Sequence, residues 1–226
     1  MPSVKIPKHD TENDMTPFVD IAFLILTFFI MATKMKPPEP VEIVTPHSVS
    51  TDKLPENDAL MIEFDANGRV FFTMLAEANP DAKRYVIENI NSNRNLGLTE
   101  AEMNSFVKAY TVGVPFTQLK SFLSQSEEAQ NKVVQPGIPV RDSAANELYY
   151  WVNAGIKGFQ GRKINYLIKG DNSAAYPDFK RILEAFKRND IFKFQLVTSP
   201  QEAPVGTELY KNRAGQTQTE APATSN

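Results

Sequence analysis

The chain has 226 residues, of which 42% are hydrophobic and none is cysteine, and its formal net charge is −3. This length suits one membrane anchor and one globular domain, with residues left over for linkers and tails. The near-neutral charge without a basic run argues against a nucleic-acid-binding protein, and the lack of cysteine rules out disulfides. The two histidines, His9 and His47, lie in flanking segments that are predicted to be poorly structured, so they do not indicate a zinc site.

The first residues predict a tail followed by a membrane helix. Residues 1–15 are short, polar and mixed in charge, which predicts a flexible tail. Residues 16–36 contain an apolar run that just meets the roughly 20 residues needed by a transmembrane helix. No small-residue cleavage site follows the run, so we predict an uncleaved anchor rather than a signal peptide. The alternative is a buried helix of a soluble protein, but the rest of the chain is not hydrophobic enough to surround such a helix.

The lysines beside this helix do not fix its orientation. Lys5 and Lys8 precede the helix, and Lys34 and Lys36 follow it. The positive-inside rule therefore does not decide between the two topologies. A short N-terminal tail inside the cell and a large domain outside is the simpler topology for one uncleaved helix, and we expect that arrangement.

Asp20 is the acidic residue inside the apolar run. Thr16 suits the N-cap and Pro17 suits the first helical position, which would place Asp20 about 4–5 Å along the helix axis. A charge at the centre of a membrane helix costs roughly 2.5–3.5 kcal/mol on insertion scales. The helix N-terminus favours the carboxylate, whereas desolvation favours the neutral acid more strongly. We therefore predict that Asp20 carries a proton in the membrane; the alternative is a hydrated acid near the surface.

Thr27 is the other polar side chain in the middle of this helix. The spacing of seven residues places Thr27 on the same side of the helix as Asp20. We expect that side to meet protein or water rather than lipid, with Thr27, Thr16 and Pro17 supporting Asp20. The alternative for Thr27 is a hydroxyl group satisfied by the carbonyl four residues back, and the sequence does not choose between the two.

Residues 37–58 are rich in proline, which predicts a semi-rigid linker. Inside the linker, Val41-Glu42-Ile43-Val44 alternates like a short strand that would pair with the edge of a neighbouring chain. Val41, Ile43 and Pro46 are therefore candidate partner-binding residues. A plain spacer is an equally good interpretation of this segment.

Residues 59–200 predict an α+β domain with a small mixed sheet, enlarged by helices from about residue 75 to 160. Residues 60–64 and 69–74 predict a hairpin, with Asn67-Gly68 supplying the positive φ that a tight turn needs. Residues 79–145 are predicted to be mostly helical. Thr99 and Glu102 form a capping box at the start of a helix that Pro115 ends. Apolar stripes predict the core positions Met103, Phe106, Val107, Tyr110, Phe116, Leu119, Phe122, Leu123, Leu148, Trp151, Val152 and Phe159.

The last ordered unit is predicted to be a strand, a helix and a parallel strand. Ile164–Lys169 predicts the first strand, and Pro177 suits the first turn of the helix. The packing face of that helix is predicted to contain Phe179, Ile182, Leu183 and Phe186. In the second strand, Phe192, Phe194 and Leu196 are expected to point inward, and Lys193 and Gln195 outward. Residues 201–226 contain few apolar side chains and are predicted to be disordered.

The sequence outside the membrane segment contains no recognisable catalytic pattern. It lacks a G-x-S-x-G motif, a P-loop, a glycine-rich dinucleotide fingerprint and a histidine pair. Gly170-Asp171 is interpreted as ordinary turn chemistry. We therefore predict that the protein is not an enzyme and uses no cofactor or metal.

Three segments resemble one known family. Thr16-Pro17-Phe18-Val19-Asp20, followed by IAFLILTFFIMAT, resembles the single transmembrane helix of the ExbD/TolR family of energy-transducing membrane proteins. The sequence VEIVTP at 41–46 resembles the extended linker of that family, and residues 164–198 are similar to its final strand–helix–strand unit. The chain departs from the family in size, because residues 75–160 look like an insertion of helices.

The resemblance implies a bacterial inner-membrane protein with a cytoplasmic N-terminus and a periplasmic domain. It implies a homodimer inside a ring formed by a multi-pass, ExbB/TolQ-like partner, with Asp20 as the proton-responsive carboxylate. It also implies that the complex passes work from the proton gradient to a TonB-like or TolA-like transducer protein.

The functional hypothesis from the sequence is therefore a subunit of an ExbB–ExbD-type motor that powers TonB-dependent outer-membrane transport. One alternative is a TolR-like subunit that maintains the envelope. Another is a membrane-tethered periplasmic binding or scaffold module in which the helix is only an anchor. A membrane-anchored enzyme ranks last because no site for it is visible.

Overall fold

The computed structural model describes residues 15–32, 41–50, 54–55, 57–76, 79–140, 146–201 and 207. The chain forms two compact units, residues 1–37 and residues 38–226, and each is described by itself. Apart from Met15, Gln201 and Thr207, the tails predicted at 1–15 and 201–226 lie outside the described residues.

The first unit contains α1 (Thr16–Ala32), a helix of 17 residues. The carbonyl of Met15 accepts a hydrogen bond from the amide of Val19 at 3.1 Å. The cap position is therefore Met15, one residue earlier than predicted, and Thr16 and Pro17 both lie in the first turn. Of the helices within the described ranges, none is both long enough and apolar enough to span a bilayer. Residues 33–36 of the predicted anchor lie outside those ranges.

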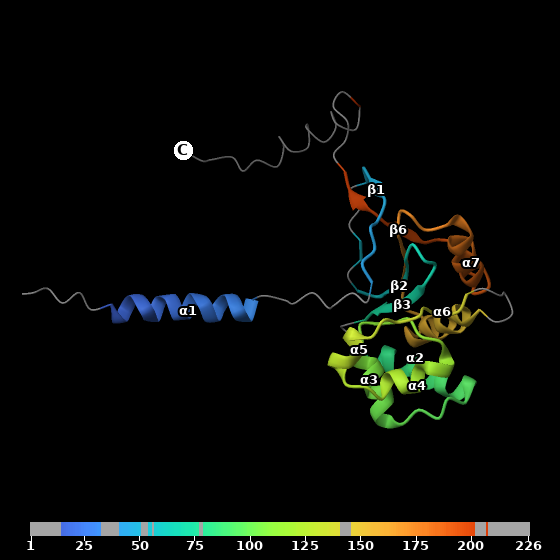
Figure 1. Cartoon of the computed structure of the whole chain (residues 1–226), viewed down its shortest axis with the longest axis horizontal. Coiled ribbons are helices and arrows are strands. Elements are labelled where there is room, and N and C mark those ends of the chain that lie inside the picture. Colours follow the sequence, from blue (N-terminus) through green and yellow to red (C-terminus); the bar gives the residue numbers. More distant parts are fainter. Residues whose placement is uncertain are drawn as a thin grey trace, which may run out of the picture. The chain divides into compact units, whose positions relative to one another are not determined.

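The second unit is built on a mixed five-stranded sheet in the order β4-β3-β2-β5-β6. Figure 1 labels β2, β3 and β6 of this sheet. The strands are β2 (Ala59–Phe64), β3 (Val70–Leu75), β4 (Thr111–Val112), β5 (Asn165–Gly170) and β6 (Gln195–Val197). β3 is antiparallel to β2 and β4, whereas β2, β5 and β6 run parallel to one another. A separate parallel pair joins β1 (His47–Ser48) to β7 (Ser199–Pro200). The predicted mixed sheet and the parallel strand–helix–strand unit are both present.

The hairpin between β2 and β3 is held by one carboxylate as well as by glycine. Gly68 has a φ of +74°, which fits the predicted turn. The side chain of Asp65 accepts hydrogen bonds from the main-chain amides of Asn67 at 3.0 Å and Arg69 at 2.8 Å. Asp65 also forms an ion pair with the guanidinium of Arg69 at 2.7 Å. The tight turn therefore has its own network of charged hydrogen bonds.

Within the described residues, six helices accompany the sheet: α2 (Pro80–Arg94), α3 (Glu100–Lys108), α4 (Phe116–Leu123), α5 (Glu127–Lys132), α6 (Glu147–Gly158) and α7 (Tyr176–Lys187). The capping box at Thr99 and Glu102 is present at the start of α3. α2 and α6 approach each other closely at Gly158, where a Cβ atom would lie 2.9 Å from the carbonyl oxygen of Ala82. A larger residue at that position would push the two helices apart.

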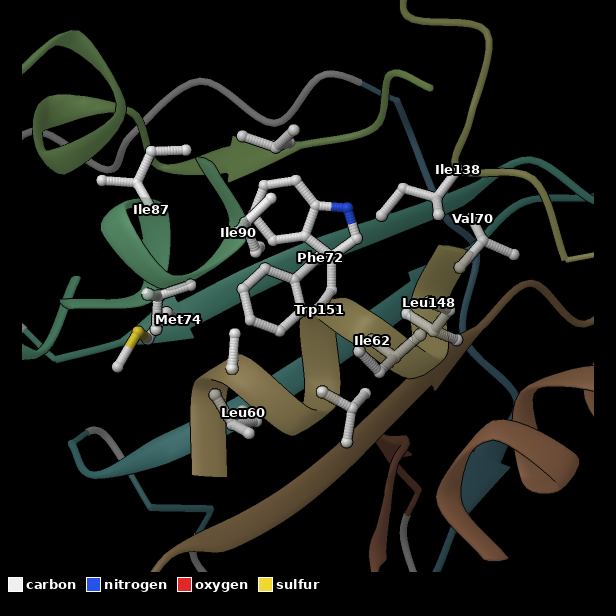
Figure 2. Packing of buried hydrophobic residues seen from close by; sticks show 14 of the residues in the cluster. Leu60, Ile62, Val70, Phe72, Met74, Ile87, Ile90, Ile138, Leu148 and Trp151 are labelled. Atoms are coloured by element: carbon white, nitrogen blue, oxygen red, sulfur yellow. The ribbon is translucent and has the colours of Figure 1, made fainter. Parts of the chain in front are cut away.

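The core lies between the sheet and these helices (Figure 2). Leu60 and Ile62 of β2 point to this side, together with Phe72 of β3. The indole ring of Trp151 on α6 stacks on Phe72 with ring centroids 5.3 Å apart. Most predicted core positions are buried, but Val107 and Tyr110 are only partly buried.

The predicted helix that was to run as far as Pro115 ends earlier. α3 stops at Lys108, and Ala109 is extended. Thr111 and Val112 then form β4, which pairs with β3 at the edge of the sheet. Tyr110 therefore does not lie on the helix. The two β-branched residues fit a strand, and this pairing overrides the helical pattern.

The segment 133–140 is also not helical, contrary to the prediction for residues 79–145. The amide of Ile138 donates to the carbonyl of Val70 at 2.7 Å, and the amide of Gly137 donates to the carbonyl of Gly113 at 2.6 Å. These bonds attach the segment to the ends of β3 and β4. Its backbone groups are satisfied by neighbours distant in sequence, which no local pattern reveals.

The last strand is shorter and more exposed than predicted. Phe194 is partly buried against Phe179 and Phe186 of α7, as expected. Phe192 is 72% exposed and Leu196 is 54% exposed, so the prediction that both are inward and buried is wrong. β6 is the edge strand of the sheet, so it has a neighbour on one side only and much of it stays open.

Candidate functional site

α1 presents apolar side chains on every side, and none of its residues is buried. Its large apolar side chains are between 51% and 88% exposed. A helix that is hydrophobic all round is stable only when a protein core or a lipid phase covers it. This helix therefore requires a covering surface.

Asp20 and Thr27 lie on one face of α1, but they do not form one hydrogen-bonded site. They are seven positions apart, which corresponds to about 10 Å along the helix axis. The hydroxyl oxygen of Thr27 lies 2.9 Å from the carbonyl oxygens of both Phe23 and Leu24. The Thr27 hydroxyl thus donates within its own helix, which is the alternative weighed from the sequence. Its lone pairs remain available to accept a bond.

The linker segment binds its own domain. The carboxylate of Asp171 accepts a hydrogen bond from the amide of Val44 at 3.0 Å, and the amide of Asn172 donates to the carbonyl of Val44 at 2.8 Å. The predicted strand at 41–44 is wrong, because the strand is His47–Ser48 and its partner is β7 of the same chain. Pro46 has no N–H group, so a ladder that needs this donor begins after it.

Of the predicted partner-binding residues, Val41, Ile43 and Pro46 are each half-buried. Pro46 uses its carbonyl to accept a bond from the amide of Ser199 at 3.0 Å. Its ring also lines a cavity of about 270 Å³. The structure thus places Pro46 at a concave surface, and it does not place Val41 or Ile43 on the lining of that cavity.

The cavity beside the linker lies where the parallel strands β2, β5 and β6 end. In open sheets with parallel strands, ligands bind outside the carboxyl ends of the strands. Its lining is mostly apolar and includes Pro46, Phe64, Asp171, Tyr176, Phe179 and Leu196. Tyr176 is 70% exposed at the cavity, so a bulky aromatic side chain faces solvent there. Sequence reasoning missed this groove, because it is formed by residues from distant segments.

Asp171 is the charged residue of this groove. Its carboxylate accepts bonds from the amide of Ser173 at 2.8 Å and from the amide of Val44 at 3.0 Å. These two amides, with Ser173 contributing more, hold the pKa of Asp171 below its ordinary value. The predicted turn role of Asp171 is correct for the bond to Ser173. Its bond to the linker was not foreseen, because the two residues are 127 positions apart.

The face of the sheet that points away from the main core carries a buried ion pair. The ammonium of Lys169 lies 3.2 Å from the carboxylate of Glu63, whose side chain is 3% exposed. The hydroxyl of Thr73 donates to the same carboxylate at 3.3 Å. Across the described ranges, no three His, Asp or Glu side chains gather into a set that would hold a metal ion. These polar groups therefore fit a role in fixing the register of β2 and β5.

Comparison with known proteins gives one result at the level of a family. The sequence model of the family described as biopolymer transport protein ExbD/TolR matches residues 7–201 of the 226 residues. The match runs from before α1 to the end of β7. No curated protein and no solved structure matches the chain.

Proposed function

This chain belongs to the ExbD/TolR family of biopolymer transport proteins, and from that membership we propose that it is the energy-transducing subunit of a proton-driven inner-membrane motor. Proteins of this family are non-enzymatic accessory proteins of transport that work with ExbB/TolQ and TonB/TolA partners. The observation that carries the proposal is the family match together with one acidic residue on an apolar, exposed helix.

The proposed anchor consists of residues 16–36, with the N-terminus in the cytoplasm and the domain in the periplasm. The exposure of the apolar side chains of α1 supports this proposal, because lipid and a ring of partner helices would cover them. We propose two copies of the chain inside an ExbB/TolQ-like ring. Thr16 and Pro17 would then begin the helix close to one membrane surface.

Asp20 is the proposed proton carrier. As a neutral acid it can lie against apolar ring residues, and as a carboxylate it needs polar or basic ring residues. A membrane potential supplies roughly 2.3 kcal/mol per charge for each 100 mV, and a charge in the centre of a membrane costs roughly 2.5–3.5 kcal/mol. The two energies are similar in size. Proton entry and release at Asp20 would therefore be enough to move the helix between two positions in the ring.

The periplasmic domain is the proposed output of the motor. We propose that it acts on a TonB-like transducer and so powers TonB-dependent outer-membrane transport. Val41, Ile43 and Pro46 remain the proposed partner-binding residues, supported by the position of Pro46 at the groove. Purification of the tagged chain in mild detergent tests the partner, because a TolA-like protein in place of a TonB-like one would assign the chain to envelope maintenance.

The Asp20→Asn substitution tests the proton carrier. The variant should insert and assemble with its ring partner as the wild type does, because an amide is close in size and uncharged. It should fail to support the process that is lost when the gene is deleted. The control is Asp81→Asn, which removes an exposed acid from the first turn of α2 and should leave that process unchanged. Full activity of an assembled Asp20→Asn variant would refute the proposal.

A helix exchange separates the motor from a simple tether. Replacing residues 17–33 with an unrelated apolar helix should abolish function if α1 works inside the ring. A membrane-tethered scaffold would tolerate the exchange, since it needs only an anchor. Equal activity of the exchanged chain and the wild type would therefore favour the scaffold.

A further inference from the structure

Residues 44–48 of the linker, the strap, are fastened to the domain. The amide N–H of Val44 donates to the carboxylate of Asp171, and the carbonyl of Val44 accepts from the amide of Asn172. The hydroxyls of Thr45 and Ser199 lie 2.6 Å apart. Farther along, the amide of Ser199 donates to Pro46, and the amide of Gln201 donates to Ser48 at 2.9 Å. The strap thus spans from the end of β5 to β7.

Hydrogen bonds rather than apolar burial hold the strap. Val44 is 61% exposed, and Val49 directly after the strap is 40% exposed. The ladder of β1 with β7 has two residue pairs, whereas β2 pairs with β3 over six. A single hydrogen bond adds little net stability, and exposed short ladders open locally before the core does. The strap is therefore among the segments that cost least to detach.

The strap also occupies a special position along the chain. It follows residues 33–43, which connect it to α1, so any pull from α1 reaches it before the sheet. In the described linker the fastening begins at Val44. β1 and β7 are parallel, and the load would leave through the N-terminal end of β7 toward β6. The force thus enters β1 and leaves β7 at the same end of the ladder. The hydrogen bonds between the two strands would then break one after another instead of together.

We propose that the strap is a releasable latch that must detach from Asp171 and β7 before a pull from α1 reaches the sheet. This inference rests on the proposed function of α1, and it adds the place at which the movement is received. Release would take Pro46 away from the wall of the groove and free the amides of Asn172 and Ser199. The surface of the domain at the ends of β5 and β6 would then differ between the latched and released states.

A disulfide across the strap tests whether release is required. The chain has no cysteine, so the Thr45→Cys/Ser199→Cys double variant introduces the sole pair. The 2.6 Å between the two native hydroxyl oxygens places the sulfur atoms within reach of a bond of about 2.05 Å. We expect oxidised cells to fall to the activity of the deletion strain and to recover on reduction. Each single-cysteine variant serves as the control and should stay active under both conditions.

The outcomes separate this inference from the proposed function. Full activity of the oxidised double variant, with the disulfide verified by its electrophoretic mobility, would overturn the latch. If Asp20→Asn is inactive in that same comparison, the proposed motor function still stands. An active Asp20→Asn variant with an inactive locked chain would overturn the proton-carrier function, while strap release would still be required.

Asp171→Asn tests the latch without a disulfide. The amide of Val44 donates to Oδ2 of Asp171 and the amide of Ser173 donates to Oδ1, so asparagine, which replaces one of these oxygens with an NH2 donor, cannot keep both bonds. In the full chain in detergent, the amide of Val44 should exchange its hydrogen faster in the variant than in the wild type, while the amides of β2 should exchange at unchanged rates. Equal exchange at Val44 in both chains would show that Asp171 does not fasten the strap.

Discussion

The surroundings of two carboxyl groups in the domain shift their pKa values in opposite directions. Asp171 is partly exposed and accepts two main-chain bonds, so the pKa of its carboxyl is lowered. Glu147, in the first turn of α6, is half-buried and caps the start of α4 by accepting a bond from the amide of Phe116 at 2.8 Å. Burial raises the pKa of Glu147, and the bond to Phe116 and the charge of Arg94 offset only part of this effect. The domain therefore contains one acid that favours ionisation and one that resists it.

The Glu147→Gln substitution should remove one contribution to the dependence of stability on pH. Because the pKa of Glu147 is raised in the folded chain, its stabilising effect is present below the ordinary pKa of glutamate and is lost as the pH rises through the raised value. The glutamine oxygen still accepts from Phe116 but does not titrate. Relative to the wild type, the variant should thus gain stability on going from about pH 3 to about pH 8.

Urea unfolding of the full chain at the two pH values measures this difference. Glu128→Gln, in the exposed first turn of α5, is the control and should show the pH dependence of the wild type. An unchanged pH dependence in Glu147→Gln would contradict the assigned effect of burial.

At the scale of elements, one aromatic side chain of α6 contacts β3, α3 and α4 together. Trp151 is fully buried and stacks on Phe72, Phe106 and Phe116, with ring centroids 5.3–5.6 Å apart. Among the described residues its indole N–H has no hydrogen-bond partner. The residue therefore stabilises through packing, while its buried donor carries a cost.

Two substitutions at Trp151 separate packing from the unpaired donor. Trp151→Ala should lower the free energy of unfolding by about 3–5 kcal/mol, because it leaves a large cavity. Trp151→Phe should cost clearly less, because it keeps an aromatic ring in the stack and removes the unpaired N–H. Denaturant unfolding of the full chain measures both values, and an equal loss for the two variants would contradict this view of the site.

The elements differ in how far the sequence predicts them. The capping box at Thr99 and the hairpin at Gly68 follow local rules, and both are found where they were expected. β4 was missed because Thr111 and Val112 become a strand only by pairing with β3, about forty residues earlier in the chain. The strap was missed for the same reason, since its partners lie at 171–172 and 199–201. Local patterns specify caps and turns, but they do not specify which distant edge a short strand will join.

At the scale of the molecule, the sequence alone predicts the family but does not predict the groove. The T-P-x-x-D pattern before an apolar run is continuous in the chain, and the family match agrees with it. The groove near Pro46 combines residues from β2, β5, β6 and α7, so it can be recognised only in the folded structure. The roles of Asp20, Thr27, Val41 and Ile43 stay predictions, because they depend on partners outside this chain.

Proton passage through the assembled complex tests the central proposal most directly. The complex is isolated through a tag on this chain, placed in lipid vesicles, and given a pH gradient and a membrane potential. Vesicles with the wild-type complex should take up protons faster than empty vesicles, and vesicles with an equal amount of Asp20→Asn complex should match the empty ones. Equal proton uptake by the wild-type and Asp20→Asn complexes would contradict the role of Asp20 as the proton carrier.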